Sequence, residues 1–279
     1  MIFDSSYYNL VINTKEIDRE ELSLTRGYSA IETHKDLTKN EFEIKQIEDA
    51  ISGKDDSAYG LKSLKSNIER IKVLHDKLAE DLSWIDEIKD VLCQYFICHT
   101  LEDIYICPVI GYDMGIGVEN TVAINLNTEL FLNCFKECIS VILHEAVHVA
   151  FARKHRINIQ LSSVREIIES LNYLIQYEGV AIYISKVYRD MHNLGTMGDI
   201  VTEDTKVTKE EYQELLIQYK KALNASSSEE ALKYGFEEKR LAHPLGFYIV
   251  NEYAKGHGID GVKEIISMNS HQFANKFLK

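Results

Sequence analysis

The sequence predicts a mostly helical α+β protein with a small sheet near the middle of the chain. Apolar residues recur at helical spacing through the first 98 residues, most clearly over 68–92. The pattern changes after His99, where 103–126 combines Pro108, several glycines and short β-type runs. Helical spacing returns at Asn127 and dominates the rest of the chain. These three observations favour helices at both ends and a short sheet between them.

In the N-terminal part, Thr38 and Glu41 form a predicted capping box before a short helix that Gly53 ends. The β-type runs lie at 103–107, 109–112 and 120–126, and they predict a hairpin or a meander.

After the sheet, Asn127 is a predicted N-cap for a helix that runs to about Lys154, with a possible break. A second long helix is expected over 163–189. Thr208 and Glu211 form another predicted capping box. The polar segment 190–206 is either a lid or a long surface loop. We expect a helical N-terminal region over 1–98 and a catalytic domain over 99–279, or one compact unit.

Composition narrows the class of protein. The chain has 279 residues and a formal net charge of −13. Its contents of 45% hydrophobic and 27% charged residues are typical of a soluble globular protein. No basic patch indicates nucleic acid, and no run approaches the ~20 apolar residues of a membrane span. The absence of a signal-like N-terminus and the five cysteines without a framework spacing predict reduced thiols and a cytoplasmic location. Cys134 and Cys138 are interpreted as buried thiols in preference to a metal pair.

The stretch VILHEAVHVA, 141–150, contains the residues that point to a metal site. Positions four apart lie on one face of a helix, so His144 and His148 can each present one nitrogen to a single metal ion. Glu145 lies ~100° round the helix, where it can accept a proton from a metal-activated water. This is the physical content of the H-E-x-x-H zinc motif. The alternative is a pair of core histidines with satisfied hydrogen bonds.

A catalytic zinc needs a third protein ligand, and three sources compete. His155 is one residue away from the spacing of a third histidine ligand, and no glycine turns the chain before it, so it is rejected. Asp199 ends a GTMGD pattern similar to the aspzincin aspartate, but it lies far from His148 and remains second. The third source is a glutamate on the helix 163–189.

Glu178 is the favoured glutamate. The apolar stripe of this helix includes Ile167 and Leu171, and Glu178 lies within ~20° of both, whereas Glu166 and Glu169 lie towards solvent. A carboxylate in an apolar stripe must be paired or must bind a metal. The alternative for Glu178 is an ion pair with a buried Arg or Lys.

HEAVH, followed on the next helix by EGVA, resembles the gluzincin branch of zinc metallopeptidases, and in particular its uncharacterised zinc-dependent peptidase families. The resemblance covers residues 100–260. It implies a zincin-like domain in which His144, His148 and Glu178 bind Zn²⁺ and Glu145 is the catalytic base.

Peptide hydrolysis also requires a group that stabilises the oxyanion of the tetrahedral intermediate. Gluzincins draw a Tyr or a His from a downstream helix, and RLAHPLGFYIVNEY supplies His243 and Tyr248. We favour His243, although it is equally placed to cap the helix that Pro244 begins.

The run TVAINLN precedes the motif helix. As an edge strand it would bind a peptide substrate by β-addition through Thr121, Ala123 and Asn125. An ordinary buried strand is the alternative.

The expected function is hydrolysis of peptide bonds in a peptide or protein substrate. Two alternatives remain: a non-catalytic zinc-binding or helical interaction protein derived from a peptidase fold, and a hydrolase of other amides or esters.

Overall fold

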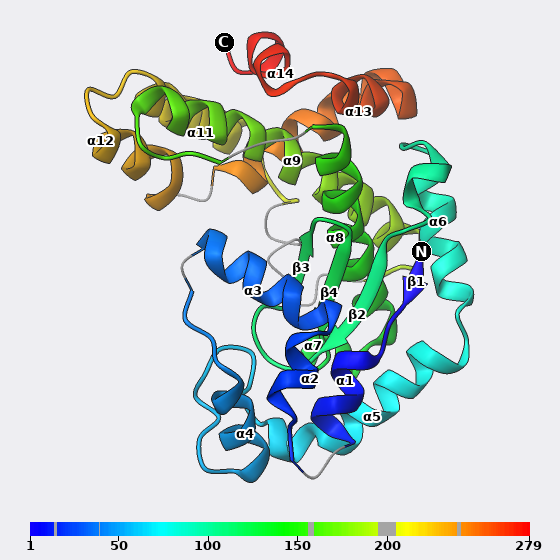
Figure 1. Ribbon diagram of the computed structural model, residues 1–279. Helices are drawn as coiled ribbons and strands as arrows, with labels where there is room; N and C mark the ends of the chain where they lie inside the picture. The colour runs from blue at the N-terminus through cyan, green and yellow to red at the C-terminus, as the bar shows by residue number, and fades with distance from the viewer. Residues whose placement is uncertain (14–15, 39, 156–158, 195–204, 239–240) are drawn as a thin grey trace. The chain divides into compact units, whose positions relative to one another are not determined.

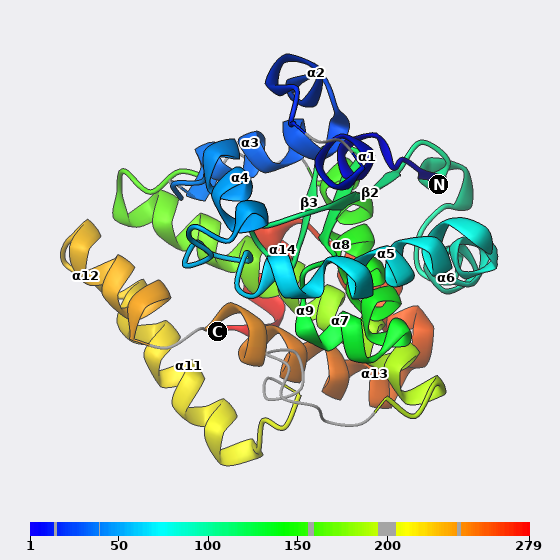
Figure 2. The same ribbon diagram turned by 90° about the horizontal axis from the view of Figure 1, so that it is seen from below.

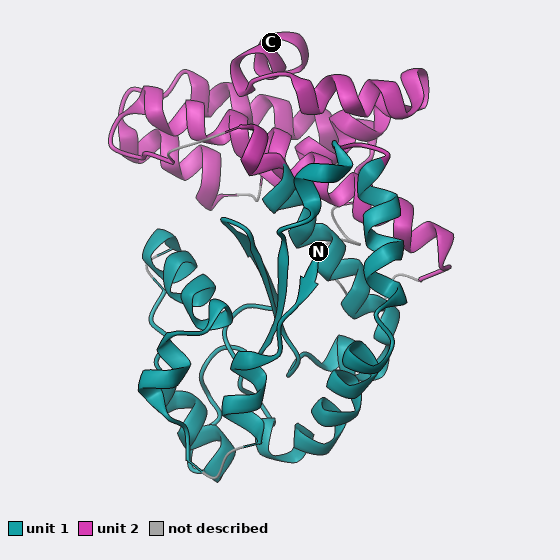
Figure 3. Ribbon diagram, turned by 45° about the vertical axis from the view of Figure 1, so that its right-hand side comes forward, with its two compact units in different colours: residues 1–93, 97–150 teal, residues 94–96, 151–279 magenta. Residues whose placement is uncertain are grey.

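The computed structural model describes residues 1–279 apart from 14–15, 39, 156–158, 195–204 and 239–240, and it divides into two compact units (Figure 3). The first unit comprises 1–93 and 97–150, and the second comprises 94–96 and 151–279. The division falls within one long helix, between Ala150 and Phe151. The first unit therefore contains residues from both of the predicted regions.

The first unit contains a four-stranded sheet and the helices that precede and follow it. Its elements, in chain order, are β1 (Ile2–Phe3), α1 (Ser6–Ile12), α2 (Arg19–Ser23), α3 (Arg26–Thr38), α4 (Ile44–Ser52), α5 (Leu64–Glu80), α6 (Ser83–Cys93), the 3-10 helix η1 (Cys98–Leu101), β2 (Tyr105–Val109), β3 (Gly115–Val118), β4 (Thr121–Asn125), α7 (Glu129–Asn133) and the first part of α8 (Phe135–Lys154).

The strands are ordered β1-β2-β4-β3 (Figure 1). β1 pairs in parallel with β2, and β2 pairs in parallel with β4. β3 and β4 form an antiparallel hairpin, so β4 is paired on both sides while β3 lies at an edge. The predicted run 120–126 contains β4, and the run 103–107 overlaps β2, which continues to Val109. The run 109–112 is not a separate strand, because Gly111 and Tyr112 both have positive φ. β1 and β3 were not predicted.

The two faces of the sheet contact different helices. Gly115 and Gly117 of β3 face α8, where the position of a Cβ would lie 3.0 Å from Glu145 Cγ and 2.5 Å from Glu145 O, respectively. Val109 of β2 contacts Gly27 of α3, and it belongs to the other face because its partner is Asn125. The sheet therefore lies between α3 and α8 (Figure 2).

A buried network of side-chain amides joins the end of β4 to two loops. Asn125 Oδ1 accepts from the amides of Gly111 at 2.9 Å and Asn127 at 3.0 Å. Asn125 Nδ2 donates to the carbonyl of Gly60 at 3.1 Å, and Asn127 Nδ2 donates to the same oxygen at 3.0 Å. Asn125 is 2% exposed, so these bonds satisfy groups that water does not reach. Asn125 is a structural residue of the first unit.

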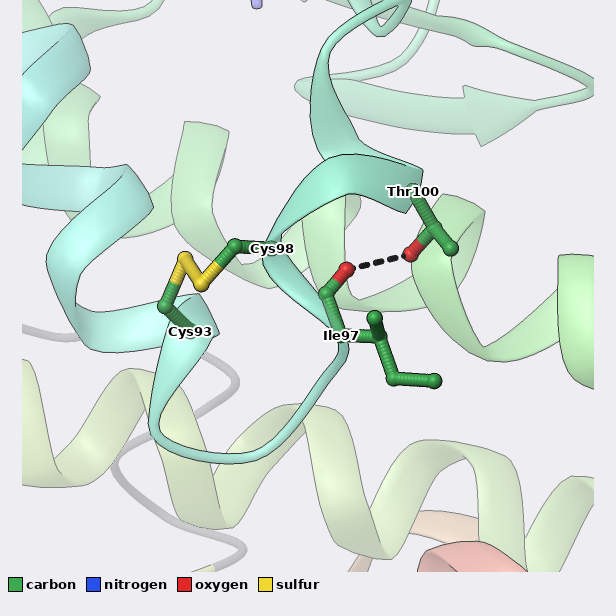
Figure 4. Close-up of a disulfide and its surroundings, with 4 residues drawn as sticks. All are labelled: Cys93, Ile97, Cys98 and Thr100. Atoms are coloured by element: carbon green, nitrogen blue, oxygen red, sulfur yellow. Dashed lines mark hydrogen bonds between the residues drawn. A yellow bond between two sulfur atoms is a disulfide. The ribbon is translucent and has the colours of Figure 1, made fainter.

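The expectation of five reduced thiols is wrong for Cys93 and Cys98, which form a disulfide (Figure 4). α6 ends at Cys93 and η1 begins at Cys98, which brings the two Cα atoms to 4.9 Å, within the usual range for a disulfide. The cysteines therefore no longer support the cytoplasmic prediction. Cys138 is a buried thiol as expected, and burial raises its pKa.

The second unit is helical in its described residues. Its elements are the end of α8, then α9 (Val164–Met191), α11 (Lys209–Leu223), α12 (Ser228–Leu232), the π-helix η2 (Lys233–Glu237), α13 (Ala242–Ser267) and α14 (Ser270–Phe277).

α9 and α13 cross closely through a pair of glycines. A Cβ on Gly246 of α13 would lie 2.0 Å from the carbonyl oxygen of Ile175, and a Cβ on Gly179 of α9 would lie 2.4 Å from Gly246 C. Neither glycine has a positive φ, so the absence of a side chain serves the close approach and not the backbone conformation. The crossing fixes the position of Glu178 next to Gly179.

Several predicted helix ends are confirmed. Gly53 ends α4 in the left-handed conformation, and Thr208 with Glu211 forms the capping box of α11. The predicted box of Thr38 and Glu41 is wrong, because Thr38 ends α3 and the box of α4 is formed by Glu43 and Gln46. In the part of the chain that the structure describes, no helix is long and apolar enough to cross a membrane.

We expect Gly246→Ala to lower the free energy of unfolding by about 3 kcal/mol, because a backbone oxygen cannot move aside as a side chain can. Gly256→Ala is the matched control on the same helix, since nothing lies within 4 Å of its Cβ position. That variant is expected to gain about 0.5 kcal/mol from helix propensity. Urea unfolding followed by circular dichroism measures both, and equal stabilities would contradict the close crossing.

Asn125→Ala is expected to lower the free energy of unfolding by about 3 kcal/mol, because two buried backbone amides lose their acceptor. Asn120→Ala is the control in the same hairpin, since the amide side chain of Asn120 makes one long bond, to Thr121 Oγ1 at 3.4 Å. A loss confined to substrate affinity in Asn125→Ala, with unchanged stability, would restore Asn125 as a substrate-binding residue.

Candidate metal centre and active site

α8 brings the two motif histidines together within the first unit. His144 and His148 are 9% and 5% exposed, and their Nε2 atoms lie 3.0 Å apart. The rings are perpendicular, with centroids 4.6 Å apart. The i,i+4 spacing therefore brings one nitrogen of each imidazole close to the other, as the sequence predicted.

This arrangement fits a metal ion. Neutral imidazole nitrogen is a ligand for Zn²⁺, and the ion accepts two or more such ligands at once. Two Nε2 atoms at 3.0 Å converge on one small volume, and the surrounding helix from 141 to 150 is uncharged apart from the motif itself. The pair could therefore supply two of the three protein ligands that a catalytic zinc requires.

Glu145 is placed differently from the histidines. It is the one residue of 141–150 that is not buried. Its side chain lies against β3, because the Cβ position of Gly115 is 3.0 Å from Glu145 Cγ and 3.3 Å from Glu145 Oε1. A partly accessible carboxylate beside a buried imidazole pair can exchange protons with a molecule that lies along β3.

The prediction for Thr121, Ala123 and Asn125 is corrected. β4 is paired with β2 and β3, so its backbone groups are already used and cannot receive a substrate strand. These three side chains also alternate with Val122, the partner of Gly117, and so they point to the face opposite α8. The strand beside Glu145 with a free edge among the described residues is β3, in which Gly115, Gly117 and Val118 are partly exposed.

In the second unit, Glu178 lies on α9 and faces His243 of α13. Glu178 Oε2 and His243 Nε2 are 3.4 Å apart, and their side chains are 14% and 22% exposed. Burial raises the pKa of the Tyr173 phenol, and the negative charge of Glu178 raises it further. Glu169 is exposed on the same helix and pairs with Arg165 at 2.8 Å. The expected contrast between a shielded Glu178 and a solvated Glu169 is confirmed, whereas Glu166, which was also expected towards solvent, is half-buried.

His243 and Tyr248 occupy different surroundings on α13. Tyr248 stacks on Tyr212 of α11, with ring centroids 4.2 Å apart and an interplanar angle of 17°. His243 instead contacts the carboxylate of Glu178. Within the second unit, His243 is therefore the residue grouped with a predicted ligand.

The other candidate metal ligands are His155, Asp199 and the two cysteines Cys134 and Cys138. His155 Nε2 lies 2.6 Å from the carbonyl oxygen of Ile266, so this histidine has a structural partner in the second unit. Asp199, and with it most of the proposed lid, lies outside the described residues. In the described part of the chain, Cys134 and Cys138 do not belong to a group of three residues that could hold a metal.

β3 was not predicted from the sequence. Its GIGV segment is short, and glycines in a strand weaken β propensity. The signal was the alternation of Gly115 and Gly117, which indicates a strand approached closely by another backbone.

No curated protein and no solved structure matches the chain. A protein-family model matches residues 9–279, and so includes α8, α9 and α13. The chain therefore belongs to the family described as "Putative zinc dependent peptidase (DUF5700)".

Proposed function

We propose that this protein is a zinc metallopeptidase that hydrolyses peptide bonds, with Glu145 as the general base. The observation that carries the proposal is the position of Glu145 in the first unit. Glu145 is partly accessible, lies in the sequence between the two buried histidines, and its side chain is against the edge strand β3. The family description supports the same reaction class.

We assign the zinc ligands to His144, His148 and Glu178. As a donor set, these two imidazoles and one carboxylate could hold a metal ion, and the same set occurs in catalytic zinc sites. When bound, zinc supplies Lewis acidity and brings the pKa of a water molecule towards neutrality. The gluzincin assignment rests on this role of Glu178 and on the resemblance of its Glu-Gly helix.

The chain's own residues move the protons. Glu145 accepts a proton as the water oxygen attacks the carbonyl carbon of the scissile peptide, and it then delivers that proton to the leaving amine. His243 donates a hydrogen bond to the oxyanion of the tetrahedral intermediate. Its contact with Glu178 favours it over Tyr248, which is stacked on Tyr212.

The substrate is proposed to bind as an extended strand beside β3. A peptide added to a sheet edge is held by backbone hydrogen bonds, which suits an enzyme that recognises the peptide bond itself. Because Gly115 and Gly117 have no side chains, Glu145 lies directly against this strand. A peptide bound along the free edge of β3 would therefore lie close to the proposed base.

Glu145→Gln is expected to abolish peptide hydrolysis while the protein keeps its zinc. The amide cannot accept the proton, and loss of a general base costs about 10²–10⁴ in rate. A quenched-fluorescence peptide library measures hydrolysis, and elemental analysis measures zinc per chain. Full activity in this variant would exclude Glu145 as the base. Zinc without hydrolysis in the wild type would favour the non-catalytic zinc-binding alternative.

Glu178→Ala is expected to lose most of its zinc, because two histidines alone bind the ion weakly. Glu169→Ala is the matched control: the same change on the same helix, at an exposed carboxylate paired with Arg165. Zinc is measured after dialysis against a weak chelator, together with the unfolding midpoint. Equal retention in the two variants would remove Glu178 from the ligand set, whatever the effect on activity.

A further inference from the structure

Gly115 and Gly117 of β3 lie against different parts of α8: Gly115 against side chains and Gly117 against the helix backbone. The Cβ position of Gly117 lies 2.5 Å from the backbone oxygen of Glu145 and 3.2 Å from His148 Cβ. The Cβ position of Gly115 lies 2.9 Å from Val141 Cγ1, 3.0 Å from Glu145 Cγ and 3.3 Å from Glu145 Oε1. Gly117 therefore limits how close the helix backbone can come, whereas Gly115 limits where the side chain of Glu145 can lie.

The backbone conformation does not explain these glycines. Neither residue has a positive φ, and both continue the regular pairing of β3 with β4, Gly115 with Ile124 and Gly117 with Val122. Alanine would fit the strand conformation at both positions. What excludes a methyl group is the space that α8 occupies, and at Gly115 much of that space belongs to Glu145.

We propose that Gly115 is a positioning residue for the catalytic carboxylate, an inference that rests on the proposed function of Glu145. A methyl group at position 115 would contact the Glu145 side chain at distances that real Cβ atoms rarely adopt. A side chain moves more easily than a backbone, so Glu145 would rotate away from β3. A displacement of ~1 Å is enough to lower the rate by about 10²-fold, because proton transfer requires close alignment.

A methyl group at position 115 would have two separable effects, one on stability and one on catalysis. Contact with Val141 affects packing and hence stability, whereas contact with Glu145 affects catalysis. Val141→Ala removes the Cγ1 atom that lies 2.9 Å away, but it leaves the two Glu145 contacts in place. The double variant Gly115→Ala/Val141→Ala therefore relieves the packing conflict without restoring the base.

The test compares Gly115→Ala, the double variant, Val141→Ala and Ile116→Val with the wild type. Ile116 is the adjacent residue of β3 and faces away from α8, so Ile116→Val is the matched control. We expect Gly115→Ala to lower kcat ten- to hundred-fold, with KM within about two-fold of the wild type and zinc content unchanged. The double variant is expected to recover the unfolding midpoint but not kcat, and Ile116→Val to keep kcat.

A crystal structure of Gly115→Ala provides a readout that does not depend on activity. The expected result is a changed Glu145 rotamer on an unmoved α8. An unchanged rotamer, or a kcat equal to that of the wild type, would overturn the proposal, as would a kcat restored in the double variant. If the wild type hydrolyses no peptide, the proposed function fails, and the rotamer alone decides whether Gly115 positions Glu145.

Discussion

The packing of α8 on β3 is the constraint on which the candidate active site depends. A helix that carries two imidazoles and a carboxylate must bury the imidazoles and yet leave the carboxylate within reach of a substrate. Helix periodicity separates these groups by ~100° around the axis. The glycines of β3 then allow the helix to lie directly against the edge of the sheet. The result is a buried His144–His148 pair and a Glu145 that remains partly accessible.

Burial also restricts what can satisfy the histidine pair. His144 and His148 are 9% and 5% exposed, and their Nε2 atoms lie 3.0 Å apart. Polar groups buried in this way must form hydrogen bonds or bind a metal ion. The apolar residues around the motif therefore suit a metal site, in addition to packing the core of the first unit.

The local features of the fold were predictable from the sequence, and the pairings between distant segments were not. Gly53 and the Thr208–Glu211 box were predicted correctly because the atoms involved are neighbours along the chain. β1 was not predicted because its two residues form a strand only through pairing with residues 105–106. The interior position of β4 was missed for the same reason, since edge or interior status depends on the register of three separate segments.

The candidate site shows the same division. His144, Glu145 and His148 form a pattern within one helix, and spacing alone indicates their geometry. Glu178 could be preferred to Glu169 because amphipathicity distinguishes the shielded face of α9 from its solvated face, where Glu169 pairs with Arg165. The same criterion misplaced Glu166, which is half-buried. The role of Asn125 could not be read in this way. Its partners Gly60 and Gly111 come from two loops that are distant from it in the sequence. The sequence alone does not show whether an asparagine side chain binds a substrate or the backbone.

The placement of Glu145 favours the proposed peptidase over a purely zinc-binding descendant of one. A structural zinc site gains nothing from an accessible carboxylate beside its ligands, and it is usually closed by a fourth protein ligand. A catalytic site needs both an open position and a base next to it. In this chain the proposed base adjoins a strand whose free edge can bind an extended peptide, and two glycines of that strand allow the helix that carries the base to lie directly against it. Each of these features has a use in hydrolysis and none is required for holding an ion, so the peptidase explains more of the observed structure.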